Sequence, residues 1–391
     1  MASLRLGIIG IGNMGSAHFA CVCGGKIQNL VLTSVCDLRQ ERLDYCAQLA
    51  PDIACYTDWK ELVNSPDVDA VLIAVPHPLH ADIAITALRA GKHVLTEKPV
   101  DIRVSKAQAL NACANASGRV FGIMFNQRTD PLFQKAREIV QSGQLGEMKR
   151  TVWIITNWYR SQHYYDSGSW RATWNGEGGG VLLNQCPHQL DLWQWICGMP
   201  VEVSAFCDVA KYHRIEVEDD VTIVTRYANG ATGAFITSTG EYPGTNRLEI
   251  SGTLGKIVLE NGKLKWWQLH TSERDVCFTA EDNSPRIETT YTEYVPDVPT
   301  PGHAGILQNF TNAVLRQEPL LAPGTDGIYE LSISNAAYLS AWNQNRPVRL
   351  PLDTAAFDAQ LAVLAEKSQQ KQAEVSRKYN TAYQDRWQVQ W

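Results

Sequence analysis

Apolar and polar positions follow a repeating pattern along the first 126 residues. Short apolar runs that end at turn residues predict buried strands, at 4–10, 30–37, 69–76, 93–99 and 119–126. The stretches between them are longer. One of them, 79–92, has apolar residues at helical spacing and closes at a glycine, so a helix is predicted there. Strands that alternate with helices in this way predict a parallel sheet with helices on both faces.

The pattern changes after residue 128. One helix is predicted at 131–146, and β-branched residues then alternate with polar ones at 149–159, 219–239 and 246–267. Asn-Gly pairs at 229–230 and 261–262 are typical of hairpin turns, so these segments predict an antiparallel sheet. Further helices are predicted at 178–193 and from 305 to about 345.

The chain is too long for one ordinary hydrophobic core, since it has 391 residues. We therefore predict an α/β protein with a doubly wound parallel sheet in residues 1–126. Residues 127–352 are predicted to form an α/β domain with a large, mostly antiparallel open sheet. A polar, helical extension is expected at 353–391.

Composition excludes several classes of protein. The net charge is −6 and no basic patch appears, which argues against a nucleic-acid partner. No apolar run approaches the roughly 20 residues needed to cross a bilayer, so no membrane partner is expected. The ten cysteines are scattered without a CxxC pair, so we expect no metal site and reduced thiols, as in a cytoplasmic protein.

A glycine-rich turn links the first predicted strand to the helical segment after it. The first glycine permits a tight turn, the second lets a pyrophosphate approach the backbone, and the third allows the helix to pack closely on the strand. Because strand, turn and helix follow in the required order, the turn predicts a dinucleotide site. Its residues are Gly10, Gly12, Asn13, Met14 and Gly15.

The choice of dinucleotide depends on Asp37, at the end of the second predicted strand. A carboxylate there accepts hydrogen bonds from the adenosine ribose hydroxyls and repels a 2′-phosphate, which favours NAD. Arg39 keeps NADP open as the alternative, because an arginine can receive that phosphate.

Lys98 follows the fourth predicted strand, in the sequence Glu97-Lys98-Pro99. Proline stiffens the segment, and the carboxyl ends of parallel strands are where open α/β sheets bind their ligands. A lysine there can polarise a substrate hydroxyl as hydride leaves. The alternative is an ordinary surface lysine in a loop.

The run AVPHPLHADIAITALRAGKHVLTEKP (74–99) resembles the glucose–fructose oxidoreductase and inositol dehydrogenase family, known as Gfo/Idh/MocA. The resemblance extends to about residue 351 and includes the glycine turn, the segment from Arg128 to Pro131 and the glycine-led helix. It implies a Rossmann domain and a second domain whose open sheet mediates homodimers or homotetramers. It also implies Lys98 as the catalytic lysine and Pro76, His80, Glu97 and Lys98 itself as cofactor contacts.

Three polar residues share one face of the predicted 178–193 helix: Asn184, His188 and Asp191 lie at i, i+4 and i+7. Spacing alone suits either a catalytic face or ordinary polar decoration. The resemblance makes His188 the general base and a substrate contact, and an ordinary imidazole pKa of about 6.5 suits that role.

The family's first aspartate on this helix is Asn184 here. Asparagine can hydrogen-bond a sugar hydroxyl but cannot carry charge. Asp191 is expected either to orient His188 or to form a salt bridge of its own. Pro187 favours the first turn of a helix, which allows Asn184 to precede it.

Aromatic residues gather in a Gly/Ser/Tyr-rich loop before this helix. Aromatic faces pack against the C–H surfaces of sugars, and loops often carry function. The alternative is that the tryptophans belong to the core. The residues we expect to contact substrate here and in the preceding segment are Trp158, Arg171, Trp174 and Arg128.

Together these features predict an NAD-dependent dehydrogenase that oxidises a secondary hydroxyl of a sugar, glycoside or cyclic polyol. Lys98 would polarise the hydroxyl and His188 would take its proton. Asn184 and the aromatic loop favour a glycoside or sugar 3-dehydrogenase branch. Two alternatives stay open: a glycosidase- or epimerase-like enzyme using tightly bound NAD for transient oxidation and elimination, and a non-catalytic NAD-sensing regulator.

Overall fold

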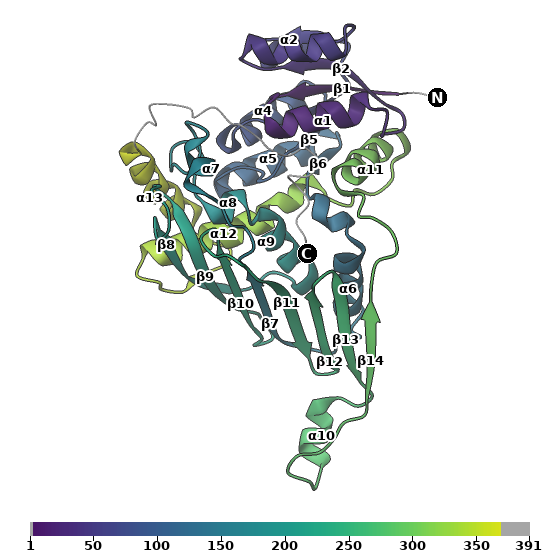
Figure 1. Cartoon of the computed structure of the whole chain (residues 1–391), viewed down its shortest axis with the longest axis vertical. Helices are drawn as coiled ribbons and strands as arrows, with labels where there is room; N and C mark the ends of the chain where they lie inside the picture. The colour runs from purple at the N-terminus through teal and green to yellow at the C-terminus, as the bar shows by residue number, and fades with distance from the viewer. Residues whose placement is uncertain (1–2, 369–391) are drawn as a thin grey trace.

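Two β-sheets organise the protein, and the computed structural model describes them within residues 3–368 (Figure 1). The smaller sheet lies in the N-terminal part of the chain and the larger one in the remainder. The predicted α/β class is confirmed.

The N-terminal sheet has six parallel strands in the order β3-β2-β1-β4-β5-β6. Five of them were predicted. The third is short and its residues are mostly exposed, so no apolar run marks it in the sequence. The strands are β1 (Leu4–Ile9), β2 (Leu30–Cys36), β3 (Ala54–Tyr56), β4 (Ala70–Ile73), β5 (His93–Thr96) and β6 (Phe121–Ile123).

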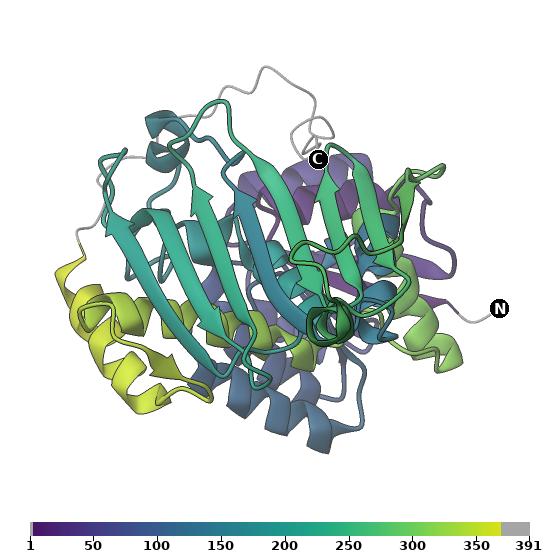
Figure 2. The same ribbon diagram turned by 90° about the horizontal axis from the view of Figure 1, so that it is seen from below.

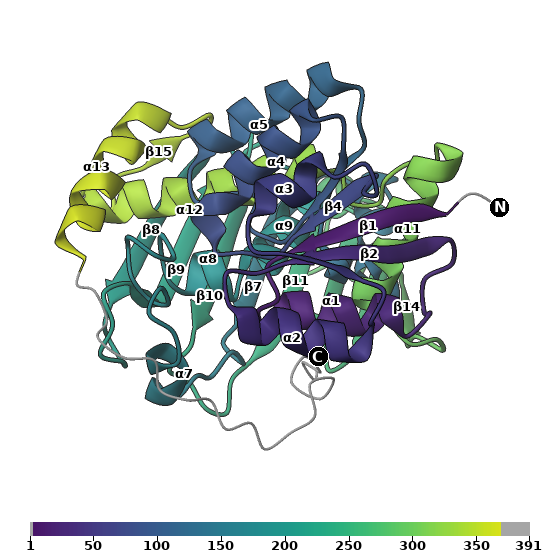
Figure 3. The same cartoon turned by 90° about the horizontal axis from the view of Figure 1, so that it is seen from above.

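Helices cover both faces of this sheet, as the alternating pattern predicts. Figure 3 shows α1 and α2 on one side of the strands and α3, α4 and α5 on the other. These elements are α1 (Asn13–Cys23), α2 (Gln40–Leu49), α3 (Trp59–Asn64), the short 3-10 helix η1 (His77–Leu79), α4 (His80–Arg89) and α5 (Val104–Ser117).

The second sheet has nine strands in the order β14-β13-β12-β11-β7-β10-β9-β8-β15. Within this sheet only β7 and β10 pair in parallel among the described strands, so the predicted mostly antiparallel sheet is confirmed. Both Asn-Gly pairs lie at hairpins, between β9 and β10 and between β12 and β13. The strands are β7 (Met148–Ile155), β8 (Glu202–Val209), β9 (Glu218–Arg226), β10 (Thr232–Ser238), β11 (Asn246–Gly252), β12 (Gly255–Glu260), β13 (Lys263–Leu269), β14 (Thr289–Tyr294) and β15 (Val348–Arg349).

The helix predicted at 178–193 is in fact two helices, α8 and α9. Pro187 has no N–H to donate to a preceding carbonyl, so it begins a new helix rather than continuing the old one. The remaining helical elements are η2 (Asn126–Thr129), α6 (Pro131–Gln141), α7 (Gln162–Asp166), α8 (Val181–Asn184), α9 (Pro187–Cys197), α10 (Glu273–Thr279), α11 (Gly302–Arg316), η3 (Gly324–Asp326), α12 (Gly327–Trp342) and α13 (Thr354–Lys367).

One face of the large sheet packs against helices, and no helix within residues 3–368 packs across the other. Figure 2, seen from below, shows the strands in front and α12 behind them. On the covered face, Trp153 of β7 and Trp193 of α9 are fully buried and both contact the ring of Phe235. This aromatic layer holds α9, and therefore the candidate catalytic histidine, on the sheet.

The first helix of the C-terminal extension, α13, contacts α5 of the first domain. α13 forms part of the helix predicted at 353–391, and Ser105 on α5 donates a hydrogen bond to Asp358 at 2.6 Å. Residues 369–391 lie outside the described part of the chain. No helix within residues 3–368 is long and apolar enough to cross a bilayer.

Candidate active site

The glycine turn lies between β1 and α1, where the strand order reverses. Gly10 has φ +92°, and a Cβ on Gly15 would lie 1.8 Å from the Gly10 carbonyl oxygen, so neither position accepts a side chain. A Cβ on Gly12 would meet nothing within 4 Å, and α1 begins there without a side-chain cap. Open space in front of a helix N-terminus suits a pyrophosphate.

Asp37 is held beside this turn. Its Oδ2 accepts a hydrogen bond from the N–H of Ile11 at 2.8 Å, and its Oδ1 accepts one from the N–H of Arg39 at 2.9 Å. The Arg39 side chain turns toward carboxylates, with Nε 3.7 Å from Asp37 and Nη1 3.8 Å from Glu41. A 2′-phosphate would therefore meet two negative groups, which favours NAD.

Lys98 at the carboxyl end of β5 connects the two domains. Its ammonium Nζ donates a hydrogen bond to the backbone carbonyl oxygen of Asn184 at 2.8 Å. Burial lowers the pKa of Lys98, and the negative charge of Glu97 opposes that lowering. The predicted lysine and the predicted helix residue therefore lie together.

Glu97 is fixed by a residue that the sequence analysis did not single out. Its Oε1 lies 2.7 Å from Nε2 of His18 on α1, and its Oε2 accepts the N–H of Lys98 at 3.2 Å. Burial alone would raise the pKa of Glu97, but the hydrogen bond and charge of His18 lower it to about 2. A permanent carboxylate thus anchors the end of β5. His18 carries no sequence signal, because it lies in an ordinary helix.

His188 lies in the first turn of α9, with its ring edge-on to Phe125 at 6.4 Å. The pKa of His188 lies well below its usual value, mainly because of burial and also because of the Lys98 charge. The pKa of His188 is therefore lower than the ordinary value expected from the sequence, because burial favours the neutral imidazole. Its Nδ1 is buried and has no hydrogen-bond partner among the residues described.

Asn184, Arg171 and Tyr164 form one polar network in front of Lys98. The Asn184 amide donates to Glu177, and its Oδ1 accepts from the Tyr164 hydroxyl at 3.3 Å. Arg171 donates to the same hydroxyl at 2.6 Å. The sequence patterns did not single out Glu177, although it directly precedes the three glycines in the sequence.

The three glycines, Gly178–Gly180, are needed for packing. A Cβ on Gly179 would lie 2.2 Å from the Tyr338 hydroxyl oxygen, and one on Gly180 would lie 2.0 Å from the Glu218 carbonyl oxygen. Glu218 also accepts the N–H groups of Gly180 and Leu182 at the start of α8. The backbone leading to Asn184 therefore lies directly against α12 and β9.

Asp191 has the second of its two expected roles, a salt bridge of its own, and Arg128 is held by that salt bridge rather than placed as the expected substrate contact. Two guanidinium nitrogens of Arg128 donate to the two oxygens of Asp191 at 2.8 and 2.6 Å, and both side chains are 1% exposed. A third donates to Asp326 at 2.7 Å. Asp191 thus orients Arg128 rather than His188, and Arg128 is a structural cation that joins η2, α9 and η3.

Trp174 also departs from its expected role. It is buried edge-on against Tyr338 and Trp342, which places it in the core rather than against a substrate. His80 is buried with its ring nitrogens 2.7 and 2.8 Å from the backbone oxygens of Pro99 and Val75, so it fastens the segment around Lys98. Pro76 precedes η1 and stays half-buried, and Trp158 is half-buried under Arg160.

Comparison with known proteins identifies the family. Residues 4–125 match the Gfo/Idh/MocA oxidoreductase family with its NAD-binding Rossmann fold, and residues 133–258 match the C-terminal domain of the same family. The chain belongs to the Gfo/Idh/MocA oxidoreductase family. The predicted resemblance is thereby confirmed, as is NAD as the cofactor that this Rossmann domain binds.

Two relatives of the enzyme are dehydrogenases of an inositol and of levoglucosan by name. Myo-inositol 2-dehydrogenase of Thermotoga maritima is 27% identical over 355 residues, which cover 89% of this chain and 98% of the relative. Levoglucosan dehydrogenase of Pseudarthrobacter phenanthrenivorans is 26% identical over 326 residues, covering 75% and 81%.

Two solved structures share the fold of the enzyme. Levoglucosan dehydrogenase in complex with NADH and L-sorbose has a TM-score of 0.74 at 23% identity, covering 90% of this chain and all of that one. The WlbA dehydrogenase from Bordetella pertussis, in complex with NADH and UDP-GlcNAcA, also gives 0.74, at 24% identity and with the same coverage.

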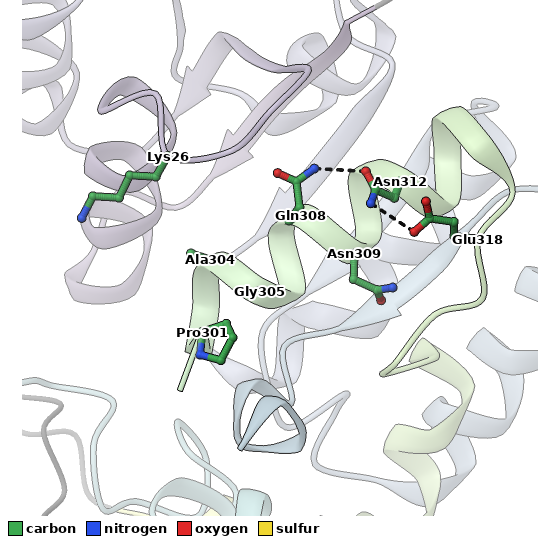
Figure 4. A pocket seen from close by; sticks show the side chains of 8 residues that line it. All are labelled: Lys26, Pro301, Ala304, Gly305, Gln308, Asn309, Asn312 and Glu318. Carbon is green, nitrogen blue, oxygen red and sulfur yellow. Dashed lines mark hydrogen bonds between the residues drawn. The ribbon is translucent and has the colours of Figure 1, made fainter. Parts of the chain in front are cut away.

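A surface cavity of about 490 Å³ lies away from this site (Figure 4). Lys26 and residues of α11 line it, and its amides bond one another: Gln308 donates to Asn312, which donates to Glu318. No predicted site residue of the oxidoreductase lines this cavity.

Glu330 on α12 is a buried carboxyl group without hydrogen-bond partners among the described residues. Burial raises the pKa of Glu330 well above its usual value, and the nearby Asp191 raises it further, whereas Lys98 lowers it. Burial therefore favours the protonated form.

Removing the Asp191 carboxylate should destabilise the enzyme strongly. Asp191→Ala leaves Arg128 buried with half of its partners, and we expect the free energy of unfolding to fall by about 3–5 kcal/mol in urea titrations. Glu138→Ala is the matched control, since it removes an exposed ion pair with Lys135 and should cost less than about 1 kcal/mol. Equal losses of unfolding free energy in the two variants would contradict the structural role assigned to the Arg128–Asp191 ion pair.

Glu330→Gln should change how stability depends on pH. The folded-state pKa of Glu330 is raised, so its contribution is fully present below the unfolded carboxyl pKa of about 4.3 and is lost as pH rises through the folded pKa. The neutral amide has no such loss. We expect thermal unfolding to show that the stability of Glu330→Gln increases relative to the wild-type enzyme as pH rises. A stability difference that is the same at every pH would contradict this.

Proposed function

We propose that the enzyme oxidises a secondary hydroxyl of a sugar, glycoside or cyclic polyol with NAD. The observation that carries the proposal is the meeting of Lys98, Asn184 and His188 at the carboxyl edge of the parallel sheet, beside the glycine turn. The inositol and levoglucosan dehydrogenases among the relatives support this substrate class. NAD, bound at Gly10–Gly15 with Asp37 toward its ribose, supplies the hydride acceptor.

Lys98 positions and polarises the hydroxyl. Its ammonium has one donor committed to the Asn184 carbonyl and can direct another toward an oxygen in the site. A cation there stabilises the negative charge that develops on the oxygen as the C–H bond breaks. Glu97, held by His18, keeps the lysine in place and favours its charged form.

His188 takes the proton. Burial keeps its imidazole neutral at physiological pH, so a lone pair is available whenever substrate binds. Asn184 replaces a carboxylate of the family, so it contributes hydrogen bonds and no charge. We infer that this uncharged position, with Trp158 and Arg171 nearby, selects a sugar ring or glycoside, and we place the oxidised carbon at position 3.

The test combines a substrate panel with two variants. We expect NADH absorbance to appear with at least one sugar, inositol or glycoside. Lys98→Ala and His188→Ala should each lower kcat by at least about 100-fold, because each removes a group that acts only as charge or proton moves. NAD binding, followed by tryptophan fluorescence, should be unchanged.

Lys106→Ala is the control for loss of a lysine, because Lys106 pairs with Asp82 at the surface. Near wild-type rates in both active-site variants would exclude the mechanism. Product without NADH would assign the enzyme to transient oxidation and elimination. Absence of turnover, together with NAD-dependent binding of a protein partner, would assign it to regulation.

We also propose that the uncovered sheet face forms a homodimer or homotetramer. Phe206 on β8 and Val224 on β9 share that face and are 58% and 48% exposed, so they offer apolar surface to a second copy. Light scattering should give a multiple of the protomer mass, and Val224→Asp should lower it. A wild-type monomer would contradict the assembly. All ten cysteines are free thiols, which suits the cytoplasm.

A further inference from the structure

We propose that the preferred substrate carries one carboxylate and that Arg160 binds it. This inference rests on the proposed function and narrows its substrate class to acidic sugars or their glycosides.

The backbone of Arg160 is fixed on both sides. Its N–H donates to the Thr239 carbonyl oxygen at 2.9 Å, and its own carbonyl oxygen lies 2.8 Å from Nε2 of His213. The other ring nitrogen of His213 lies 2.8 Å from the buried carboxylate of Asp219. A loop residue held in this way presents its side chain in one direction.

The guanidinium lies among aromatic rings and has no carboxylate partner. It lies over Trp158 at 5.6 Å and over Tyr164 at 5.1 Å. Its Nη1 donates to the Tyr159 carbonyl oxygen at 3.0 Å, whereas its Nε is buried without a hydrogen-bond partner, and Arg160 forms no ion pair with a carboxylate within residues 3–368. A buried donor without a partner calls for a ligand that completes it.

Arg160 is one aromatic ring away from the reaction centre. The ring that it contacts belongs to Tyr164, whose hydroxyl donates to Asn184. The backbone carbonyl of Asn184 in turn receives Lys98. A sugar whose hydroxyl lies at Lys98 can therefore place a substituent at Arg160 while its C–H face packs on Trp158.

The site contains one positive charge that no neighbouring carboxylate balances, so it can bind one negative group. Lys98 lies beside Glu97, and Arg171 lies 3.7 Å from Glu177, so each of these cations has a carboxylate nearby. Burial favours the neutral forms of His188 and Glu330. Arg160 remains as the uncompensated cation, and a guanidinium binds a carboxylate through two parallel hydrogen bonds.

The phosphates of NAD are the other possible source of negative charge. They belong at the start of α1, whereas Arg160 follows β7 and contacts the second domain. A phosphate with two charges would also need a second cation, and Arg171 already faces Glu177. We therefore assign Arg160 to the substrate and distinguish the two sources in the experiment.

The test compares methyl glucopyranosiduronate with methyl glucopyranoside, which differ only in having a carboxylate or a hydroxymethyl group. At saturating NAD we expect kcat/KM to favour the uronate by at least about tenfold, the effect of a charged hydrogen bond. Arg160→Gln should abolish this preference and leave the neutral glycoside unaffected. Arg160→Lys should retain part of the preference for the uronate, because lysine keeps the positive charge but lacks the two parallel N–H donors of the guanidinium.

Arg214→Gln is the matched control. Arg214 is exposed next to the same loop, its N–H bonding Gln162 of α7, so its loss removes a charge without the aromatic setting. The preference should survive in this variant. Equal use of both glycosides by the wild-type enzyme would overturn the inference, and so would a higher KM for NAD in Arg160→Gln with the preference unchanged.

A binding measurement separates this inference from the proposed function. Calorimetric titration of the NADH-loaded enzyme with each glycoside needs no turnover. Tighter binding of the uronate that is lost in Arg160→Gln would support the carboxylate site even if neither compound were oxidised. Equal binding of the two would reject it even if both were oxidised.

Discussion

The hydrogen bond from the Lys98 ammonium to the Asn184 carbonyl is the contact on which the arrangement of the active site depends. Lys98 belongs to the nucleotide-binding sheet, and Asn184 ends the short helix α8 of the second domain. A charged donor paired with a backbone carbonyl in a buried setting is both strong and directional. It therefore aligns the lysine of one domain with the histidine that follows, one turn later, in the other.

Burial decides the charge of each group around that contact. Glu97 stays ionised because His18 and the Lys98 N–H satisfy its oxygens. Glu330 lacks such partners, so the same burial favours its neutral form. His188 is neutral for the same reason. The protonation state of each buried group therefore depends on its hydrogen bonds and not on its residue type alone.

The sequence was sufficient for five of the six parallel strands and for the glycine turn, because each depends on local spacing. Gly10, Gly12 and Gly15 have meaning only between a strand and a helix, and that order can be read directly. The break between α8 and α9 was signalled only by Pro187. The partners of Arg128 could not be predicted, because Asp191 and Asp326 are 63 and 198 residues from it, and only tertiary folding brings them together. His18 and Glu330 lie in regular helices whose pattern contains no trace of what they face.

The three glycines before α8 allow the backbone to lie directly against α12 and β9, because they have no side chains. The Tyr338 hydroxyl and the Glu218 carbonyl occupy the positions where side chains of Gly179 and Gly180 would begin. A single added methyl group would push the backbone away from α12 and β9, and Asn184, only a few residues later, would move with it. The distance between Lys98 and His188 would then change although neither residue is altered. An intact set of catalytic side chains is therefore not enough to predict activity in a variant of this chain, because the empty volume at these glycines is itself part of the active site.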